Sequence, residues 1–216
     1  MRRVRVGPSR ALRNGSTERG SQRIAQKGMA VPILAAIPEL WPEGVLDETD
    51  PPSRCLTQWV ALRVQPRCKK AVARVLMRDD FAYFLCLRSV TRVYQRRRVV
   101  SQVPLFPGYV FAAGENQELL EQLWQVRHVS CVLTPPDPAK FLRELTSLRR
   151  ILSAGVPVTP EEQLQPGQRA RIIRGCFEGL EGTVLINRSG LRLMIAVGLL
   201  GRGASIEVTP DMVERL

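Results

Sequence analysis

Residues 104–111 read PLFPGYVF, a segment that combines a Pro-Gly turn with closely spaced aromatic residues. It follows a run of three arginines at positions 96–98. The Pro-Gly pair interrupts regular structure, so Tyr109 and Phe111 are expected on one face of the strand that follows. An aromatic face of this kind belongs either to the core or to a surface that docks another protein.

Composition and charge narrow the class of protein. The 216 residues suffice for one or two domains with a core, and 44% apolar residues are typical of a globular chain. The net charge of +12 is uneven: it is +7 over residues 1–28, −4 over 29–54, +9 over 55–153 and zero over 154–216. The basic middle segment therefore either faces a polyanion or forms a solvated basic surface.

Cysteine and histidine usage argues against catalysis and metal binding. The five cysteines include no C-x-x-C pair, which fits a reducing cytoplasm and disfavours a disulfide framework or zinc site. His128 is the only histidine in the sequence, and no phosphate-binding, nucleophile-elbow or zinc-protease motif occurs. We therefore expect no enzyme activity, no metal and no cofactor.

The first 54 residues are predicted to be a disordered basic extension and linker, with regular structure beginning near Thr57. An arginine-rich start followed by MAVPILAAIP at positions 29–38 superficially resembles a secretory signal. The prolines and the long polar lead disfavour that interpretation, and the apolar run is too short to span a membrane. Met29 is an alternative start to Met1.

Residues 55–152 are predicted to form an α+β domain. Asp137 and Pro138 are expected to cap and open its last helix, whose inward stripe is predicted to be Phe141, Leu145, Leu148 and Leu152. The order is that of a split βαβ antiparallel sheet with helices and an inserted arginine-rich hairpin. The expected strands lie at 57–64, 82–88, 91–100, 108–113 and 129–133, and the expected helices at 67–78, 115–124 and 138–152.

A proline-containing linker is predicted at residues 153–166, followed by a small module at 167–216. Short strands separated by Gly-rich turns predict a β-barrel of about five strands. Residues 167–184 read GQRARIIRGCFEGLEGTV, in which the glycines permit tight reversals. The turn looks like a KOW motif; the alternative is a Gly-rich hairpin of another SH3-like barrel. Its key residues are Gly175, Phe177, Gly179 and Gly182.

Together these segments resemble the NusG family of transcription elongation factors, from about Trp59 to Leu216. PLFPGYVF matches a hallmark of the family, and VRHVSCV at 126–132 is similar to a second one. The resemblance implies an NGN domain followed by an SH3-like KOW barrel. The hairpin and the KOW turn look closest to the UpxY and RfaH-like antiterminators. VQPRCKK at 64–70 departs from the family, because Cys68 and Lys69 replace more usual polar and acidic residues.

The resemblance also implies a docking site for RNA polymerase. In NusG-like proteins the aromatic NGN face docks on the coiled-coil clamp helices of the largest subunit, a helix-in-groove type of recognition. In those relatives, the segment that corresponds to VRHVSCV, which contains His128 here, approaches the opposite pincer of the polymerase. Phe111 is assigned to the core instead. The residues expected to contact polymerase are Trp59, Phe106, Pro107, Tyr109 and His128.

Two further contacts follow from the same resemblance. The basic residues are expected to face DNA of the elongation complex, where phosphate contacts position without specifying sequence, or else to form a solvated face. They are Arg67, Lys69, Lys70, Arg96, Arg97 and Arg98. The KOW turn, with Gly175, Phe177, Gly179 and Gly182, is expected to recruit a small-subunit ribosomal protein or Rho.

The expected function is that of a cytoplasmic, monomeric and non-enzymatic factor that promotes processive elongation or antitermination. One alternative is a general NusG that also acts in Rho-dependent termination. Another is a KOW-containing protein that binds RNA or the ribosome. The absence of net charge over residues 154–216 favours the transcription role, because an RNA-holding KOW module is expected to be basic.

Overall fold

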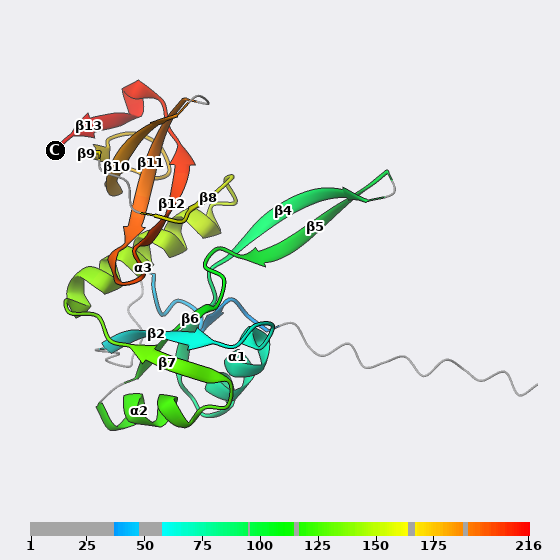
Figure 1. Cartoon of the computed structure of the whole chain (residues 1–216). Coiled ribbons are helices and arrows are strands. Elements are labelled where there is room, and N and C mark those ends of the chain that lie inside the picture. The colour runs from blue at the N-terminus through cyan, green and yellow to red at the C-terminus, as the bar shows by residue number, and fades with distance from the viewer. Residues whose placement is uncertain (1–36, 48–57, 95, 115–116, 164–166, 188–189) are drawn as a thin grey trace, which may run out of the picture. The chain divides into compact units, whose positions relative to one another are not determined.

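A continuous apolar run in β2 (Gln58–Val64), buried on both faces of the strand, places it inside a five-stranded antiparallel sheet. The computed structural model describes residues 37–47, 58–94, 96–114, 117–163, 167–187 and 190–216 (Figure 1). All of them belong to one compact unit, residues 36–216. The sheet order is β1-β3-β6-β2-β7, with β1 at Leu40–Trp41, β3 at Ala82–Phe84, β6 at Tyr109–Gly114 and β7 at Val129–Leu133.

The two faces of this sheet are covered by different helices, because successive side chains of β2 point in opposite directions. Trp59 and Ala61 pack in the cluster that contains the buried residues of α3 (Pro138–Ser153). Leu62 and Val64 pack in the cluster that contains the buried residues of α1 (Lys69–Arg78) and Leu120 of α2 (Gln117–Gln122). This arrangement is the α+β fold that the sequence predicts.

The start of α3 is as predicted: the Asp137 carboxylate accepts a hydrogen bond from the backbone N–H of Lys140 at 2.9 Å, and Pro138 opens the helix. Ile151 rather than Leu152 completes the buried stripe. The start of α1 differs from the prediction. Arg67 has a φ of 65°, which is not helical, so the helix begins at Lys69 rather than at residue 67. The expected helix at 115–124 appears as α2 and a short 3₁₀ turn, η1 (Leu123–Gln125), with residues 115 and 116 outside the description.

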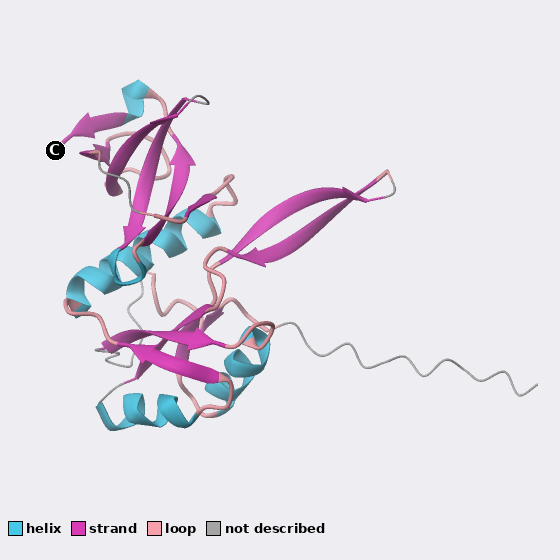
Figure 2. Cartoon of the chain, in the orientation of Figure 1, coloured by secondary structure: helices cyan, strands magenta, loops and turns pink. Residues whose placement is uncertain are grey.

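The inserted hairpin is a separate two-stranded ribbon formed by β4 (Leu87–Tyr94) and β5 (Arg97–Pro104) (Figure 2). The arginine-rich hairpin is present as predicted, but its bounds differ from the expected strand at 91–100, because the chain reverses in the middle of that range. Arg96 takes a φ of 64°, and Val93 pairs with Arg98 across the reversal. Neither strand alternates apolar and polar residues regularly, so periodicity alone does not reveal the turn between them.

The prediction that regular structure begins near Thr57 is also wrong. Residues 37–47 belong to the fold: Leu40 and Trp41 form β1, which pairs with β3, and Val45 and Leu46 are buried. The Tyr83 hydroxyl donates to the backbone carbonyl of Pro38 at 3.1 Å. A strand of two residues carries no periodic signal, which is why the sequence pattern does not mark it. The rest of the predicted extension and linker, residues 1–36 and 48–54, lies outside the described residues.

The C-terminal residues form a six-stranded antiparallel sheet in the order β13-β9-β10-β11-β12-β8. Its buried residues include Ile172, Leu193, Ile195 and Ile206. Five of these strands lie within residues 167–216, where about five were predicted, and the sixth, β8, lies in the predicted linker. The bounds are β8 at Thr159–Glu161, β9 at Gln168–Ile172, β10 at Glu181–Asn187, β11 at Gly190–Val197, β12 at Arg202–Glu207 and β13 at Val213–Arg215.

The predicted linker, residues 153–166, is thus not structureless over its described part. α3 runs through Ser153, and β8 pairs with β12 of the C-terminal sheet. Short 3₁₀ turns complete the module at Gly198–Leu200 (η2) and Pro210–Met212 (η3).

Candidate functional site

The Pro-Gly turn of PLFPGYVF is fixed by groups from outside it. Gly108 has a φ of 85°, a conformation that favours glycine. Its carbonyl accepts a hydrogen bond from the backbone N–H of Val64 at 2.8 Å. The carbonyl of Phe106 accepts one from Lys69 Nζ at 2.7 Å. The turn is therefore held against the end of β2 and the start of α1.

A second turn is tied to the same end of β2. The backbone N–H of Gln65 donates to the carbonyl of His128 at 3.0 Å, and His128 Nδ1 lies 3.1 Å from Gln65 Oε1. His128 takes a φ of 73°, so the chain turns sharply before entering β7. We call the residues gathered at this end of the sheet the turn cluster: Gln65, Pro107, Gly108, Tyr109 and His128.

Of the five residues predicted to contact polymerase, three lie in the turn cluster and two lie in the core. Pro107 is exposed, and Tyr109 and His128 are half-buried. Trp59 and Phe106 are each only 2% exposed. The expectation that their rings face a partner therefore does not fit the structure.

The burial of Phe106 has a clear physical cause. Its ring packs edge-on against Phe111 at a centroid distance of 6.2 Å, and Phe111 packs in the same way against Phe141 of α3 at 5.8 Å. Phe106 precedes β6, so strand alternation does not predict which way it points. Phe111 is buried, where the sequence placed it.

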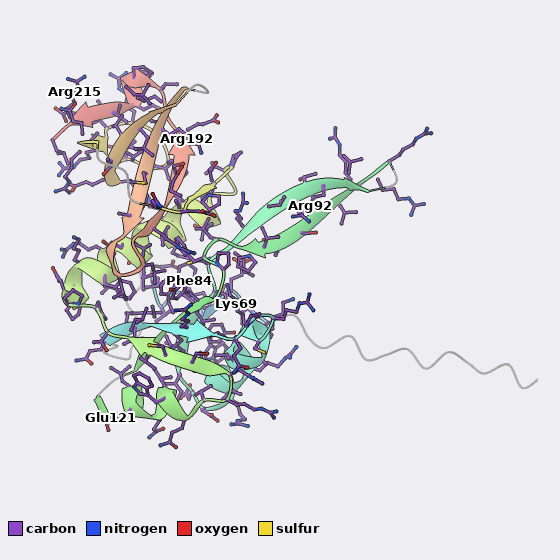
Figure 3. The ribbon with its side chains drawn as sticks, viewed as in Figure 1. Lys69, Phe84, Arg92, Glu121, Arg192 and Arg215 are labelled. Atoms are coloured by element: carbon purple, nitrogen blue, oxygen red, sulfur yellow. The ribbon has the colours of Figure 1, made fainter. Side chains whose placement is uncertain are left out.

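The residues predicted to contact nucleic acid also differ in exposure. Arg67 and Lys70 are exposed, whereas Lys69 is turned inward to the carbonyl of Phe106 (Figure 3). Burial lowers the pKa of Lys69 to about 8, because the charged amine loses water on leaving the surface. Lys69 thus supports the Pro-Gly turn rather than facing outward, which corrects the expectation for this residue.

The two-stranded ribbon of β4 and β5 carries the remaining residues predicted to contact nucleic acid. Residues 87–104 contain five arginines and no acidic residue. The predicted Arg96, Arg97 and Arg98 are exposed at its turn, and Arg92 extends from β4 (Figure 3). Arg92 is not among the predicted contacts, although it belongs to the same run of sequence without acidic residues. Arg88, at the base, donates to the carbonyl of Val158 at 3.2 Å.

The predicted KOW turn is shaped by its glycines but buries its aromatic ring. Gly175 and Gly179 have φ angles of 94° and 84°. Gly182 is needed for a different reason: a Cβ there would lie 2.5 Å from the carbonyl oxygen of Met194. Phe177 is 6% exposed and packs in the core, so the expectation that its ring faces a partner is corrected.

Two absences concern only the part of the chain that the structure describes. Within it, no helix is long and apolar enough to cross a membrane. In the same residues, no three His, Cys, Asp or Glu side chains come together as a metal site requires.

Comparisons with known proteins give one consistent family. The model of the NusG family, described as transcription termination factor nusG, matches residues 57–174. The transcription termination/antitermination protein NusG of Pseudomonas aeruginosa is 27% identical over 177 residues, covering 74% of this chain and 98% of that protein. The protein of the same name from Pasteurella multocida is 26% identical over 163 residues, covering 71% and 87%.

Among solved structures, this chain is similar to one titled "Domain interaction in Thermotoga maritima NusG", with 21% identity and a TM-score of 0.40. That match covers 74% of this chain and 97% of the other. The family model alone covers more than half of the chain. The chain therefore belongs to the NusG family of transcription termination and antitermination proteins.

Proposed function

We propose that this protein binds RNA polymerase through the turn cluster and promotes processive elongation or antitermination. The observation that carries the proposal is that two turns, one with exposed Pro107 and half-buried Tyr109 and the other with half-buried His128, are both hydrogen-bonded to the chain at the end of β2. These residues come from turns that are far apart in sequence and are joined by hydrogen bonds to β2.

The proposed partner surface is the coiled-coil clamp helices of the largest polymerase subunit. A tyrosine whose ring is partly buried and partly open is well suited to anchor such a contact, because it is already ordered before binding. The bonds from Val64 and Lys69 hold the adjacent backbone in place. Arg63, which pairs with Tyr109 across the strands, is exposed beside it. Clamp bridging would then keep the polymerase closed on its nucleic acid.

The test is binding of the full chain to an isolated clamp-helix fragment. Tyr109→Ala is expected to weaken binding by about tenfold or more, as expected for an interface anchor. Ile186→Ala is the matched control, because Ile186 is 83% exposed on β10 of the C-terminal sheet. Circular dichroism checks that each variant folds. Unchanged affinity in both Tyr109→Ala and Pro107→Ala would contradict the docking assignment.

The arginine ribbon is proposed to contact DNA of the elongation complex. Its arginines lie on a ribbon without carboxylates, and Arg96, Arg97 and Arg98 are exposed. Replacing Arg97 and Arg98 with alanine is expected to reduce the slope of log affinity against log salt by about 1.8 on duplex DNA. Arg171→Ala is the control, because this residue is paired with Glu181. An unchanged slope would argue for a merely solvated basic face.

The C-terminal module is proposed to recruit a small-subunit ribosomal protein or Rho. Because Phe177 is buried, the exposed neighbours Ile173, Arg174 and Glu178 are the candidate contacts of the KOW turn. Binding of each purified candidate partner to wild type and to Glu178→Ala checks this proposal. If neither partner binds the wild-type chain, recruitment through this turn is wrong.

The alternatives have their own discriminating observations. A general NusG would change termination at Rho-dependent sites throughout the genome, whereas an operon-specific factor would change polymerase occupancy at few loci. An RNA- or ribosome-binding protein would bind RNA through its C-terminal module. The arginines at 169 and 171 are both paired with Glu181, which disfavours that role. Polymerase occupancy with and without the protein separates the three functions.

A further inference from the structure

The ribbon formed by β4 and β5 has two faces that differ in exposure. Residues that pair across the strands share a face, and the faces alternate along each strand. One face is exposed from the Ser89–Gln102 pair to the Val93–Arg98 pair, and we call it the open face. Its members are Ser89, Thr91, Val93, Arg98, Val100 and Gln102.

The opposite face is partly covered at the base of the ribbon and is basic toward its tip. Arg88 at the base is half-buried and donates to the carbonyl of Val158 at 3.2 Å. Toward the tip, Arg92 extends from this face (Figure 3), and Arg97 is also exposed on it. The open face has a single arginine, Arg98, at its outer end. Most of the open face is therefore uncharged, although the ribbon as a whole is basic.

The open face presents apolar groups to water. Val93 is 71% exposed and Val100 is 64% exposed. They belong to neighbouring pairs of the register, so they lie diagonally across the two strands, within contact range of one ligand. Thr91 pairs with Val100 and adds a methyl group and a hydroxyl. Methyl groups gain nothing from a phosphate, so this patch fits a ligand that offers apolar and hydrogen-bonding groups side by side.

The pair of the open face that lies nearest the base adds hydrogen-bonding capacity. Gln102 Nε2 donates to Ser89 Oγ at 3.0 Å, which aligns the amide across the ribbon. A glutamine amide has two donor hydrogens and an accepting oxygen, and a serine hydroxyl both donates and accepts. One bond inside the ribbon therefore leaves both side chains able to bind a further group, with less side-chain freedom lost on binding.

The base edges in the major groove of duplex DNA present this combination of groups. They carry hydrogen-bond acceptors, donors and the methyl group of thymine, and the groove is about 12 Å wide, enough for a two-stranded ribbon. From Ser89 to Val93 the strand rises about 14 Å, which corresponds to about four base pairs. The right-handed twist of the ribbon lets it follow the groove.

The arginines are placed to hold such a ribbon in the groove. Their stems are long and flexible and the ribbon is only two strands wide, so the guanidinium groups of Arg92 and Arg97 can reach past its edges to the flanking phosphates. Phosphate contacts fix the position of the ribbon, and the open face is left for the bases. Duplex RNA fits less well, because its major groove is deep and too narrow for side chains to read.

We propose that the open face of the ribbon reads base edges in the major groove of duplex DNA. The residues that set the sequence preference are Thr91, Val93, Val100 and Gln102. The inference rests on the proposed contact of the ribbon with DNA and goes beyond it, because phosphate contacts alone carry no sequence preference. Methyl groups of valine and threonine select thymine, and a glutamine amide selects adenine. The expected target is therefore a site of about four base pairs that contains A·T pairs.

The test selects duplexes from a random-sequence DNA library with the full chain. The affinity for a selected duplex is then compared with that for a scrambled duplex of the same composition. Val100→Ala with Gln102→Ala is expected to lower the ratio of these affinities by about tenfold, while the affinity for the scrambled duplex and its salt slope stay the same. If circular dichroism shows that this variant does not fold, Thr91→Val, which keeps the shape of the side chain and removes its hydroxyl, is expected to lower the same ratio.

The matched control is Val99→Ala with Ser101→Ala, the neighbouring positions of the same strand on the opposite face. Its affinity ratio is expected to equal that of the wild type. Arg92→Ala is expected to weaken binding to both duplexes equally and to reduce the slope of log affinity against log salt by about 0.9.

Each other outcome has a distinct meaning. Binding to duplex DNA without enrichment of any sequence would overturn the reading of bases and leave the proposed DNA contact standing. An equal loss of the ratio in the control variant would show that the open face is not the reading face. No binding to duplex DNA would remove the proposed contact and this inference together. Stronger enrichment of RNA hairpins than of duplex DNA would refute the choice of ligand.

Discussion

Two turns of this protein are built from the same ingredients but held in different ways. The turn at 106–109 and the turn at 175–180 each combine a positive-φ glycine with a phenylalanine that points into the core. In the second turn most of the backbone bonds are local: the N–H of Gly179 donates to the carbonyl of Ile172, and the N–H of Ile172 to the carbonyl of Leu180. One bond comes from outside, from Arg150 of α3 to the carbonyl of Cys176. In the first, the carbonyls of the turn accept from groups of β2 and α1, about forty positions earlier in the chain.

This difference determines what can disturb each turn. The turn of the C-terminal module depends on the strand next to it, so it is expected to form whenever that module folds. The Pro-Gly turn depends on the placement of α1, so a change in that helix is expected to reach Tyr109 and the proposed docking surface. In both turns the aromatic residue is an anchor of the fold, and the exposed neighbours are the candidates for binding.

The largest expected effect comes from removing these anchors. Phe106→Ala is expected to lower the free energy of unfolding by about 3–5 kcal/mol, because the ring is fully buried against Phe111. Phe177→Ala is expected to cost a comparable amount in the C-terminal module. Tyr109→Ala is expected to cost about 1–2 kcal/mol, because its side chain is only half-buried. Urea denaturation measures all three. A cost below about 1 kcal/mol for Phe106→Ala would show that its ring is not a core anchor.

A smaller effect separates two glycines of the second turn. Gly182→Ala is expected to cost about 2–3 kcal/mol, since its Cβ would lie 2.5 Å from backbone oxygen of Met194 and cannot be accommodated without moving a strand. Gly179→Ala meets no atom within 4 Å, but its φ of 84° costs about 1 kcal/mol for an alanine. Thermal unfolding of the two variants measures the difference. Equal costs would mean that backbone conformation, not close packing, governs both positions.

Much of the fold follows from local signals. The cap at Asp137, the stripe of α3 and the alternation in β11 each predict the element that forms. Elements that depend on distant partners are harder to predict: β1 and β8 have two and three residues, and each is defined by the strand that it joins. Periodicity needs more residues than these strands contain.

The candidate site is less predictable than the fold for the same reason. The hallmark segment locates the turn, yet Phe106 and Tyr109 lie three residues apart and differ in burial. Whether these side chains are buried or exposed depends on Phe111, Phe141 and Lys69, which come from other elements. The inward position of Lys69 has no local sequence signal, because most lysines at the start of a helix face solvent.

The smallest expected effect is a pH dependence of stability, which tests whether the Pro-Gly turn depends on Lys69 of α1. Burial lowers the pKa of Lys69 to about 8 from 10.5, so the native state releases this proton earlier than the unfolded state. Between those values the unfolded state binds more protons, and the contribution of Lys69 to stability rises with pH. Burial of Cys86 acts in the opposite direction: its pKa is raised well above 9.0, so its contribution falls as the unfolded thiol ionises.

Lys69→Met is made in a Cys86→Ala background, because the charge of Lys69 lowers the pKa of the Cys86 thiol and its removal would otherwise change the contribution of the thiol as well. The stability of the protein that keeps Lys69, relative to the Lys69→Met variant, is expected to increase between about pH 8 and about pH 10, by less than about 1 kcal/mol, since water still reaches the half-buried amine. Urea denaturation at both pH values gives the difference. A relative stability that is flat or falls with pH would mean that the amine stays hydrated. The Pro-Gly turn would then be held by the N–H of Val64 without help from α1, and the contrast between the two turns would weaken.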